Sequence, residues 1–240
     1  MKIDSTIKRR ELPEHFKEHL SFTYPGSIKS SIVIVTYIML DLLIILPILY
    51  PYHTLTVWIT MPLLFIVNIW ALSMLIRKVE SLQFEFILFL GTVGAVGSIC
   101  YFVLIQKTAY INLNIQSPYF LIISIIMFLS FLYFQVWFHN KKYTSLNSNF
   151  GKFKNLPWHY KLLAIAPPAG YIIGQYFMNK SQMAISSLMI IVYVILSTFF
   201  TYMSVKFIHR YLFMKANMHL LKTAYLKTKI KENPGGAKRV

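Results

Sequence analysis

The feature that most constrains this chain is a series of six apolar blocks, each roughly twenty residues long. They occupy residues 31–50, 55–76, 84–105, 118–138, 160–178 and 183–208. A helix needs about 20 apolar residues to cross the hydrocarbon core of a bilayer. The blocks lack the alternating pattern of barrel strands, so helices are left as the structures that satisfy backbone groups in lipid. The sequence therefore predicts an all-α membrane protein, a bundle of six transmembrane helices.

Composition agrees with this prediction. Hydrophobic residues make up 56% of the 240 residues and charged residues 13%, with a mean hydropathy of +0.55. A soluble domain carries roughly 25% charged residues. The net charge of +16 raises the question of a nucleic-acid partner, but we recognise no nucleic-acid-binding fold in the sequence. Contact with anionic lipid headgroups explains the positive charge better.

The distribution of Lys and Arg predicts the orientation of the helices. With six spans, 22 of the 24 Lys and Arg residues fall on one side, and only Lys107 and Lys180 fall on the other. Cytoplasmic loops are enriched in these residues. We therefore expect a multi-pass protein of the cell membrane with both termini in the cytoplasm. The predicted parts are a cytoplasmic segment (1–30), a transmembrane domain (31–208) and a cytoplasmic basic helix with its tail (209–240).

Both ends of the chain carry amphipathic patterns. From Phe207 to Tyr225 the apolar positions recur at steps of three and four, which places them on one helical face. The cations on the flanks of this face are Arg210, Lys215, Lys222 and Lys227. The pattern predicts a basic amphipathic C-terminal helix that lies along the anionic inner leaflet or docks a partner. A short N-terminal helix within residues 13–22 would bury Phe16 and Leu20.

Asp41 is the most unusual residue of the apolar blocks, because it lies about ten residues into the first span. A carboxylate at that depth costs roughly 2.5–3.5 kcal/mol to insert and usually faces other helices or a watery cavity. Candidate partners at similar depth are Asn68 in the second span and Ser197 or Thr198 in the sixth. Two roles remain open: a polar contact between helices, or a site for an ion, proton or ligand.

Three glycines in the third span, Gly91, Gly94 and Gly97, recur at steps of three. No strand precedes them, so they do not form a dinucleotide-binding loop. In a membrane span, small residues allow close approach of another helix. We expect this face to pack within the chain, with a homodimer contact as the alternative.

The fifth predicted span is interrupted by Pro167 and Pro168. Two adjacent prolines remove two backbone donors and kink or unwind a helix. Broken helices line binding sites in many transporters, although a simple kink is the default. Gln175, further along this span, is a weaker candidate for a pathway residue.

Motifs for chemistry are missing from the sequence. The seven histidines do not cluster along the chain, and His15 and His19, four residues apart, form the nearest approach to a metal motif. Glu85 lies near Arg77, and we expect an ion pair at the membrane edge. No zinc, phosphate-binding or Ser–His–Asp motif is present. We therefore expect no enzymatic activity, no metal and no cofactor.

The general style of the sequence carries one resemblance. Richness in Ile, Lys, Asn, Tyr and Phe, short loops and basic cytoplasmic ends are seen along the whole chain. In these respects it resembles small six-span membrane proteins of low-GC Gram-positive bacteria, many of which act as toxin immunity proteins or sit beside type VII secretion systems. The resemblance implies a non-enzymatic protein that binds a membrane partner, a toxin or a secretion component. The alternative is a transporter or an exporter permease subunit with Asp41 in the pathway.

Overall fold

The structure is a computed structural model that describes residues 3, 11–79, 82–143, 170, 175–176 and 181–221. Every regular element in these residues is a helix. The short helix α1 spans Glu14–His19. The other elements are α2 (Pro25–Val33), η2 (Ile34–Leu42), α3 (Leu43–Leu49), α4 (Thr54–Ile76), α5 (Gln83–Lys107), η4 (Thr108–Asn112), α6 (Tyr119–Lys142) and α8 (Gln182–Ala216).

Five of the described helices are long and apolar enough to cross a membrane. They are Pro25–Leu49, which joins α2, η2 and α3; Thr54–Ile76; Gln83–Asn112; Pro118–Lys142; and Gln182–Ala216. They correspond to the first, second, third, fourth and sixth predicted spans and are compatible with a multi-pass membrane protein. Most of the fifth predicted span, including Pro167 and Pro168, lies outside the described residues.

The first long helix begins earlier than the apolar block predicted. It begins at Pro25, where a proline occupies the first helical turn, rather than at residue 31. Proline has the backbone angle of a helix and lacks an N–H that this position would leave unpaired. The residues between Pro25 and the apolar block therefore form the first turns of the same helix.

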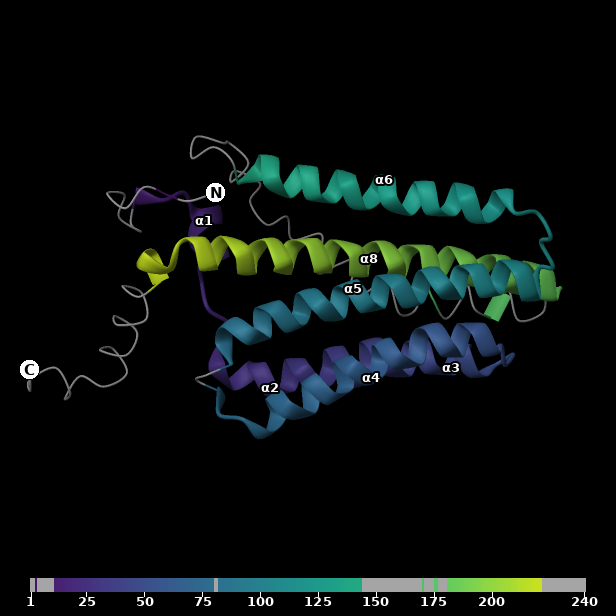
Figure 1. The fold of residues 1–240 in the computed structure, drawn as a ribbon, viewed down its shortest axis with the longest axis horizontal. Helices are drawn as coiled ribbons and strands as arrows, with labels where there is room; N and C mark the ends of the chain where they lie inside the picture. Colours follow the sequence, from purple (N-terminus) through teal and green to yellow (C-terminus); the bar gives the residue numbers. More distant parts are fainter. Residues whose placement is uncertain are drawn as a thin grey trace, which may run out of the picture.

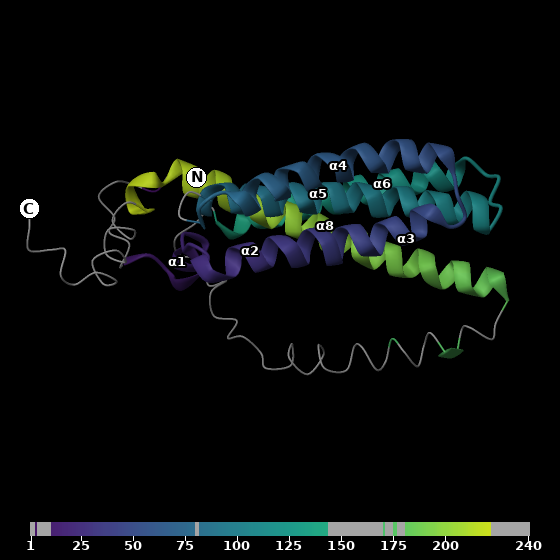
Figure 2. The same ribbon diagram turned by 90° about the horizontal axis from the view of Figure 1, so that it is seen from below.

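The long helices lie side by side, with α5 at the centre (Figures 1 and 2). Helix α8 runs along one side of α5, and the hairpin of α2–η2–α3 and α4 lies on the other. Helix α6 is at the edge, beyond α8. Burial agrees with this order, since 67% of the most apolar window of α5 is buried and 0% of that of α6.

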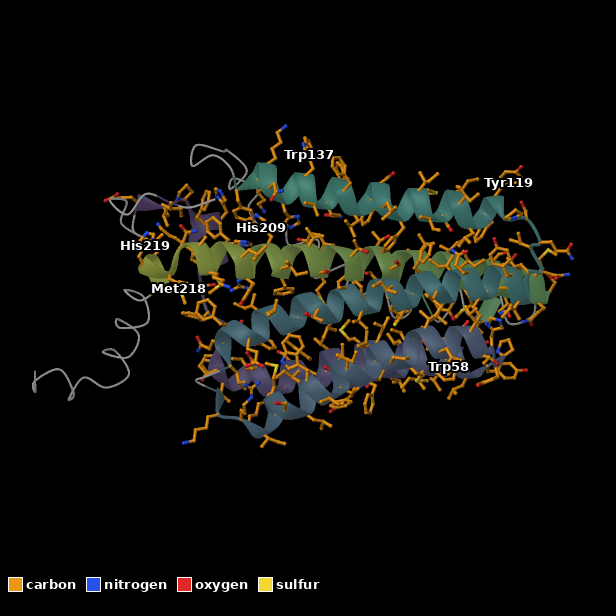
Figure 3. All side chains as sticks on the ribbon, viewed as in Figure 1. Trp58, Tyr119, Trp137, His209, Met218 and His219 are labelled. Carbon is orange, nitrogen blue, oxygen red and sulfur yellow. The ribbon has the colours of Figure 1, made fainter. Side chains whose placement is uncertain are left out.

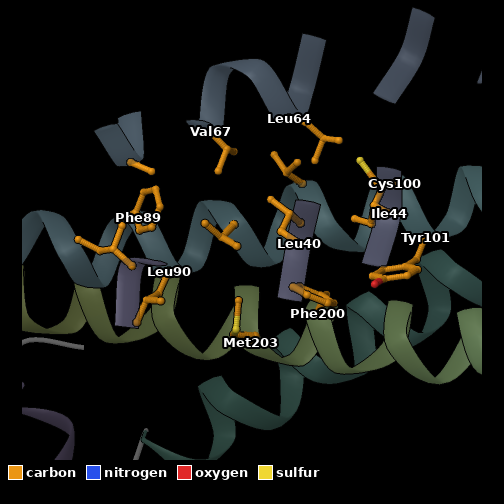
Figure 4. Packing of buried hydrophobic residues seen from close by; sticks show 14 of the residues in the cluster. Leu40, Ile44, Leu64, Val67, Phe89, Leu90, Cys100, Tyr101, Phe200 and Met203 are labelled. Carbon is orange, nitrogen blue, oxygen red and sulfur yellow. The ribbon is translucent and has the colours of Figure 1, made fainter. Parts of the chain in front are cut away.

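The buried core is apolar along the described bundle. In the first long helix the buried side chains recur every four residues, from Ile28 to Ile48. They face α4 and α5, where Leu64, Val67 and Phe89 pack against them (Figure 4). Lipid is as apolar as these side chains, so close packing rather than exclusion of water holds such helices together.

The three glycines of α5 face α8 within the same chain. A Cβ added to Gly94 would lie 2.5 Å from the backbone nitrogen of Ser204 and 2.8 Å from the carbonyl oxygen of Phe200. Added at Gly91 or Gly97, it would meet the side chains of Ile208 or Phe200 at 2.7 and 2.5 Å. The absence of side chains here lets the two backbones come into contact.

The C-terminal part of α8 differs from the predicted amphipathic helix. Helix α8 ends at Ala216, and the Asn217 side chain bonds back to the Phe213 carbonyl at 2.8 Å while accepting the Ile3 N–H at 2.7 Å. The apolar face that begins at Phe207 packs against the N-terminal segment, not against lipid alone. This second cluster contains Ile3, Leu12, Phe16, Leu20, Ile87, Tyr143, Phe213, Met214, Leu220 and Leu221.

The N-terminal prediction is confirmed in its main points. Helix α1 lies within residues 13–22, and Phe16 and Leu20 are fully buried. For the C-terminal apolar face we predicted contact with the inner leaflet or with a partner. In its described part, residues of the chain's own N-terminus pack against this face.

Candidate functional site

Asp41 and Asn68 form a polar pair inside the apolar part of the bundle. The Asn68 Nδ2 atom donates to Asp41 Oδ1 at 3.1 Å and to the Leu64 carbonyl oxygen at 3.0 Å. The hairpin between the first long helix and α4 brings the two residues to the same depth. Among the described residues, the Asp41 carboxyl accepts this hydrogen bond from Asn68.

The backbone around Asp41 is itself unusual. Asp41 belongs to η2, a nine-residue π-helical stretch between two α-helical segments. π-Helical turns are rare in proteins, and those that occur are frequently found at functional sites. Along the first long helix, which includes the wider turns of η2, every fourth residue is buried. Leu40 belongs to this buried series, whereas Asp41, the next residue, does not.

The Asp41–Asn68 pair is partly exposed at the surface of the bundle. Both side chains are intermediate in burial, while their neighbours Ile38, Leu42 and Phe65 are 51%, 52% and 66% exposed. The pair is therefore a polar spot in an otherwise apolar lateral surface. A lateral partner with a hydrogen-bond donor could reach the carboxyl group.

The other predicted polar residues lie elsewhere. Ser197 donates to the Ser98 carbonyl oxygen at 3.2 Å and links α8 to α5. Thr198 lines an apolar cavity of about 330 Å³ between α5, α6 and α8. Gln175 is exposed. The structure therefore brings Asn68, and not these residues, to Asp41.

Glu85 joins the ends of α4 and α5. Its Oε1 atom accepts a hydrogen bond from the Trp70 indole at 2.8 Å and forms an ion pair with Arg77. The expected Arg77–Glu85 ion pair is thus confirmed. Glu85 thus ties the end of α4 to the beginning of α5 and takes no part in the Asp41–Asn68 pair.

A cluster of histidines at the end of the bundle near α1 was not foreseen. His19 Nε2 lies 3.2 Å from His209 Nδ1, and the His139 and His209 rings are 6.2 Å apart. The ring of Tyr143 stacks on His19 at 4.1 Å and on His209 at 5.1 Å. Three helices, α1, α6 and α8, meet through these aromatic rings.

We predicted that the histidines do not cluster, and this prediction is wrong for the folded chain. His19 and His209 are 190 residues apart in the chain, so no local pattern links them. The apolar repeat of α8 and the aromatic residues of α1 indicate that these helix faces are buried. They do not indicate that the two faces pack against each other.

The electrostatics of this cluster favour neutral imidazoles. Burial, followed by the nearby His209 and Arg210, lowers the pKa of His19 from 6.5 to about 2. Burial also raises the pKa of Tyr143 to about 12. The short contact between His19 and His209 needs one N–H and one lone pair, which at least one neutral ring supplies.

Arg210 bonds to the backbone at the end of α1, and its contact with lipid headgroups stays a prediction. Its Nε donates to the His19 carbonyl oxygen at 3.2 Å, and its Nη2 donates to the Ser21 carbonyl oxygen. These carbonyls lie at the C-terminal end of α1 and two residues beyond it, where a cation is favourable. Lys215 is exposed, whereas Lys222 and Lys227 lie outside the described residues. Within the described part of the chain, no group of three His, Cys, Asp or Glu residues is arranged to hold a metal ion.

The described residues thus define an all-helical protein with five candidate membrane-spanning helices, a lateral polar pair and an aromatic–histidine cluster at one end. No protein-family model, curated protein or solved structure matches the chain.

Proposed function

We propose that the chain is a non-enzymatic integral membrane protein that acts by binding another membrane protein within the bilayer. The resemblance in sequence style suggests the kind of partner, a membrane-active toxin or a component of a secretion system. The observation that carries the proposal is the partly exposed Asp41–Asn68 pair in an apolar lateral surface.

A polar group that faces lipid is unfavourable, which is why such residues normally face other helices. Asn68 satisfies one carboxyl oxygen of Asp41, and it is itself partly exposed. Side-chain hydrogen bonds between helices are a common device of association in membranes. A partner helix that carries a donor at this depth would cover the Asp41–Asn68 pair and bond to it.

The topology we propose has six spans with both termini in the cytoplasm. In Figure 1, α6 and α8 both run toward the end that carries α1. Consecutive spans of a membrane protein run in opposite directions, so two spans that run in the same direction need another crossing between them. The direction of α6 and α8 therefore supports a sixth crossing between residues 143 and 181.

The transporter alternative has less support in the described residues. Residues around Asp41 on the buried side of the first helix, such as Leu40 and Ile44, pack tightly against α4 and α5 (Figure 4). Two cavities, one between α5, α6 and α8 and another of about 490 Å³ lined by residues of α3, η4 and α8, do not include Asp41 or Asn68 in their lining. Flux in proteoliposomes that is abolished by Asp41→Asn would favour transport instead.

The proposal is tested by photo-crosslinking in living cells. A photoreactive amino acid replaces Phe65, which is 66% exposed beside Asn68, and the matched control replaces Ile126 on α6, which is 58% exposed. We expect a protein adduct at position 65 that disappears when Asp41→Leu and Asn68→Leu are added. Identification of the adduct by mass spectrometry gives the partner, and co-expression then tests whether the chain protects cells against it or aids its secretion.

Two results would contradict the proposal. Lipid adducts alone at position 65 would show that no protein covers the Asp41–Asn68 pair. An identical protein adduct at positions 65 and 126, unchanged by the double substitution, would show contact without recognition.

A further inference from the structure

A cavity of about 490 Å³ with a mixed polar and apolar lining lies at the end of the bundle opposite α1, where α3 and η4 end and α8 begins. Trp58 and Tyr119 lie toward this end, and His209 lies toward the other (Figure 3). Tyr50 beside the cavity is 86% exposed. Exposed aromatic residues of this kind mark the level of lipid headgroups. The cavity is lined by Leu46, Pro47, Tyr50, Pro51, Thr108, Asn112, Gln182, Ile185, Ser186, Met189 and Tyr193.

The lining combines polar and apolar side chains. Asn112 is the last residue of η4 and Gln182 the first of α8, so both carboxamides lie at the outer ends of their helices. Ser186 lies about one turn deeper. Met189 lies about one further turn along α8, and Leu46 contributes an apolar side chain from α3. Carboxamides at the outer end beside apolar side chains fit an amphipathic molecule whose polar end faces the water.

Ser186 offers a hydrogen-bonding group that its own protein leaves unused. Its side chain is 2% exposed, and its Oγ atom has no partner among the described residues. The next residue, Ser187, donates to the Met183 carbonyl oxygen at 2.9 Å, as helical serines commonly do. Buried polar atoms without a partner are uncommon in folded proteins, so the Ser186 hydroxyl is a hydrogen-bonding group available to a molecule in the cavity.

The nearest buried cation is already engaged. Lys107 is 4% exposed, and its Nζ atom donates to the carbonyl oxygens of Pro47 and Ile48 at 2.6 and 3.0 Å. It thereby fixes the end of α3, which forms one wall of the cavity. The lining itself contains carboxamides, hydroxyls and apolar groups but no charged side chain. The lining thus favours an uncharged group rich in hydrogen-bond donors and acceptors.

We propose that this cavity binds the hydroxyl-bearing headgroup of a lipid, a glycerol or sugar group, in the leaflet at this end of the bundle. Hydroxyl groups both donate and accept, as do the carboxamides of Asn112 and Gln182 and the Ser186 hydroxyl. The C–H faces of the headgroup pack on Tyr50, which follows the outer end of α3. The first carbons of the lipid tails reach Leu46 and Met189. This site is independent of the lateral partner proposed above.

The test is native mass spectrometry of the full-length protein in a detergent without a sugar headgroup. Glucosyl diacylglycerol, phosphatidylglycerol and phosphatidylcholine are added separately, with tails of the same length. We expect the two lipids with hydroxyl-bearing headgroups to bind about tenfold more tightly than phosphatidylcholine, which has none. Loss of one hydrogen bond in Ser186→Ala should weaken their binding about fivefold, and Ser187→Ala should leave it unchanged.

Further measurements make the result decisive. Gln182→Leu should weaken binding as Ser186→Ala does, and thermal unfolding of each variant verifies that it folds. Competition by free glucose or glycerol would support recognition through the headgroup, whereas binding of the free sugar without binding of the lipid would overturn the proposed lipid. Equal affinity for the three lipids, or affinities that neither variant changes, would overturn the site.

Discussion

Asp41 illustrates how far single residues could be interpreted from the sequence. Its depth follows from its place in the first span, and the tight turn after that span brings Asn68 to the same level. The partnership was therefore among the contacts that the sequence allowed, and the structure selects it over Ser197 and Thr198. Its partial exposure could not be predicted, because it depends on the π-helical stretch and on where α5 packs.

The Asp41–Asn68 bond should make a small but measurable contribution to stability. Asn68→Leu removes the donor and leaves the carboxyl group of Asp41 exposed to apolar surroundings. Side-chain hydrogen bonds in membrane proteins contribute about 0.6 kcal/mol on average, and we expect a loss of about 1 kcal/mol in the free energy of unfolding. Unfolding by SDS in mixed micelles measures this.

A double-mutant cycle with Asp41→Leu isolates the pair. The coupling energy between the two substitutions should be about 0.6 kcal/mol. Additive effects of the two single substitutions would mean that the bond is absent in the folded protein.

At the scale of helices, the approach of α5 and α8 depends on Gly94. In Gly94→Ala the new Cβ would lie 2.5 to 2.8 Å from backbone atoms of α8, and backbone cannot rotate away as a side chain can. The helices must move apart, which should lower the free energy of unfolding by about 1–3 kcal/mol.

Gly26→Ala is the matched control, because the three atoms nearest to its Cβ would all belong to the Tyr24 side chain, the first at 2.8 Å. Tyr24 is 77% exposed and free to turn. Equal stability of the two alanine variants would show that α5 and α8 do not touch at Gly94.

The docking of α1 should depend on pH through His19. Its pKa is lowered by burial to about 2 in the folded protein and returns to about 6.5 when α1 leaves the cluster. Docking is therefore fully stable above about pH 6.5 and loses stability as the pH falls toward 2. The groups that face His19 are His209 and Arg210 of α8, His139 and Lys142 of α6, and Tyr143.

Hydrogen exchange of the α1 amides measures this effect. Protection should fall by up to about tenfold for each pH unit below about 6, after correction for the intrinsic exchange rate. His19→Phe keeps a ring for stacking on Tyr143 but cannot titrate, so its protection should change less with pH. An equal change in both proteins would place the pH dependence in other groups, such as His209.

At the scale of the whole molecule, the parts governed by local physics were predictable. Lipid thickness fixes the length of an apolar helix, so five spans were located to within about six residues at either end, apart from the longer continuations of α5 and α8. The meeting of α1 with the end of α8 was not predictable. It joins residues such as Phe16 and Phe213, and the same apolar face would have suited the surface of a membrane.

The number of crossings can be tested from two positions that flank the residues between α6 and α8. Lys142 ends α6 and Ser181 precedes α8, and six spans place them on opposite sides of the membrane. In intact cells a membrane-impermeant thiol reagent should label Ser181→Cys, whereas Lys142→Cys should react only after permeabilisation. The natural Cys100 is fully buried and should add little background. Labelling of both positions from the same side would leave five crossings. The two termini would then lie on opposite sides of the membrane, and the Lys and Arg residues before α1 and after α8 would face different compartments.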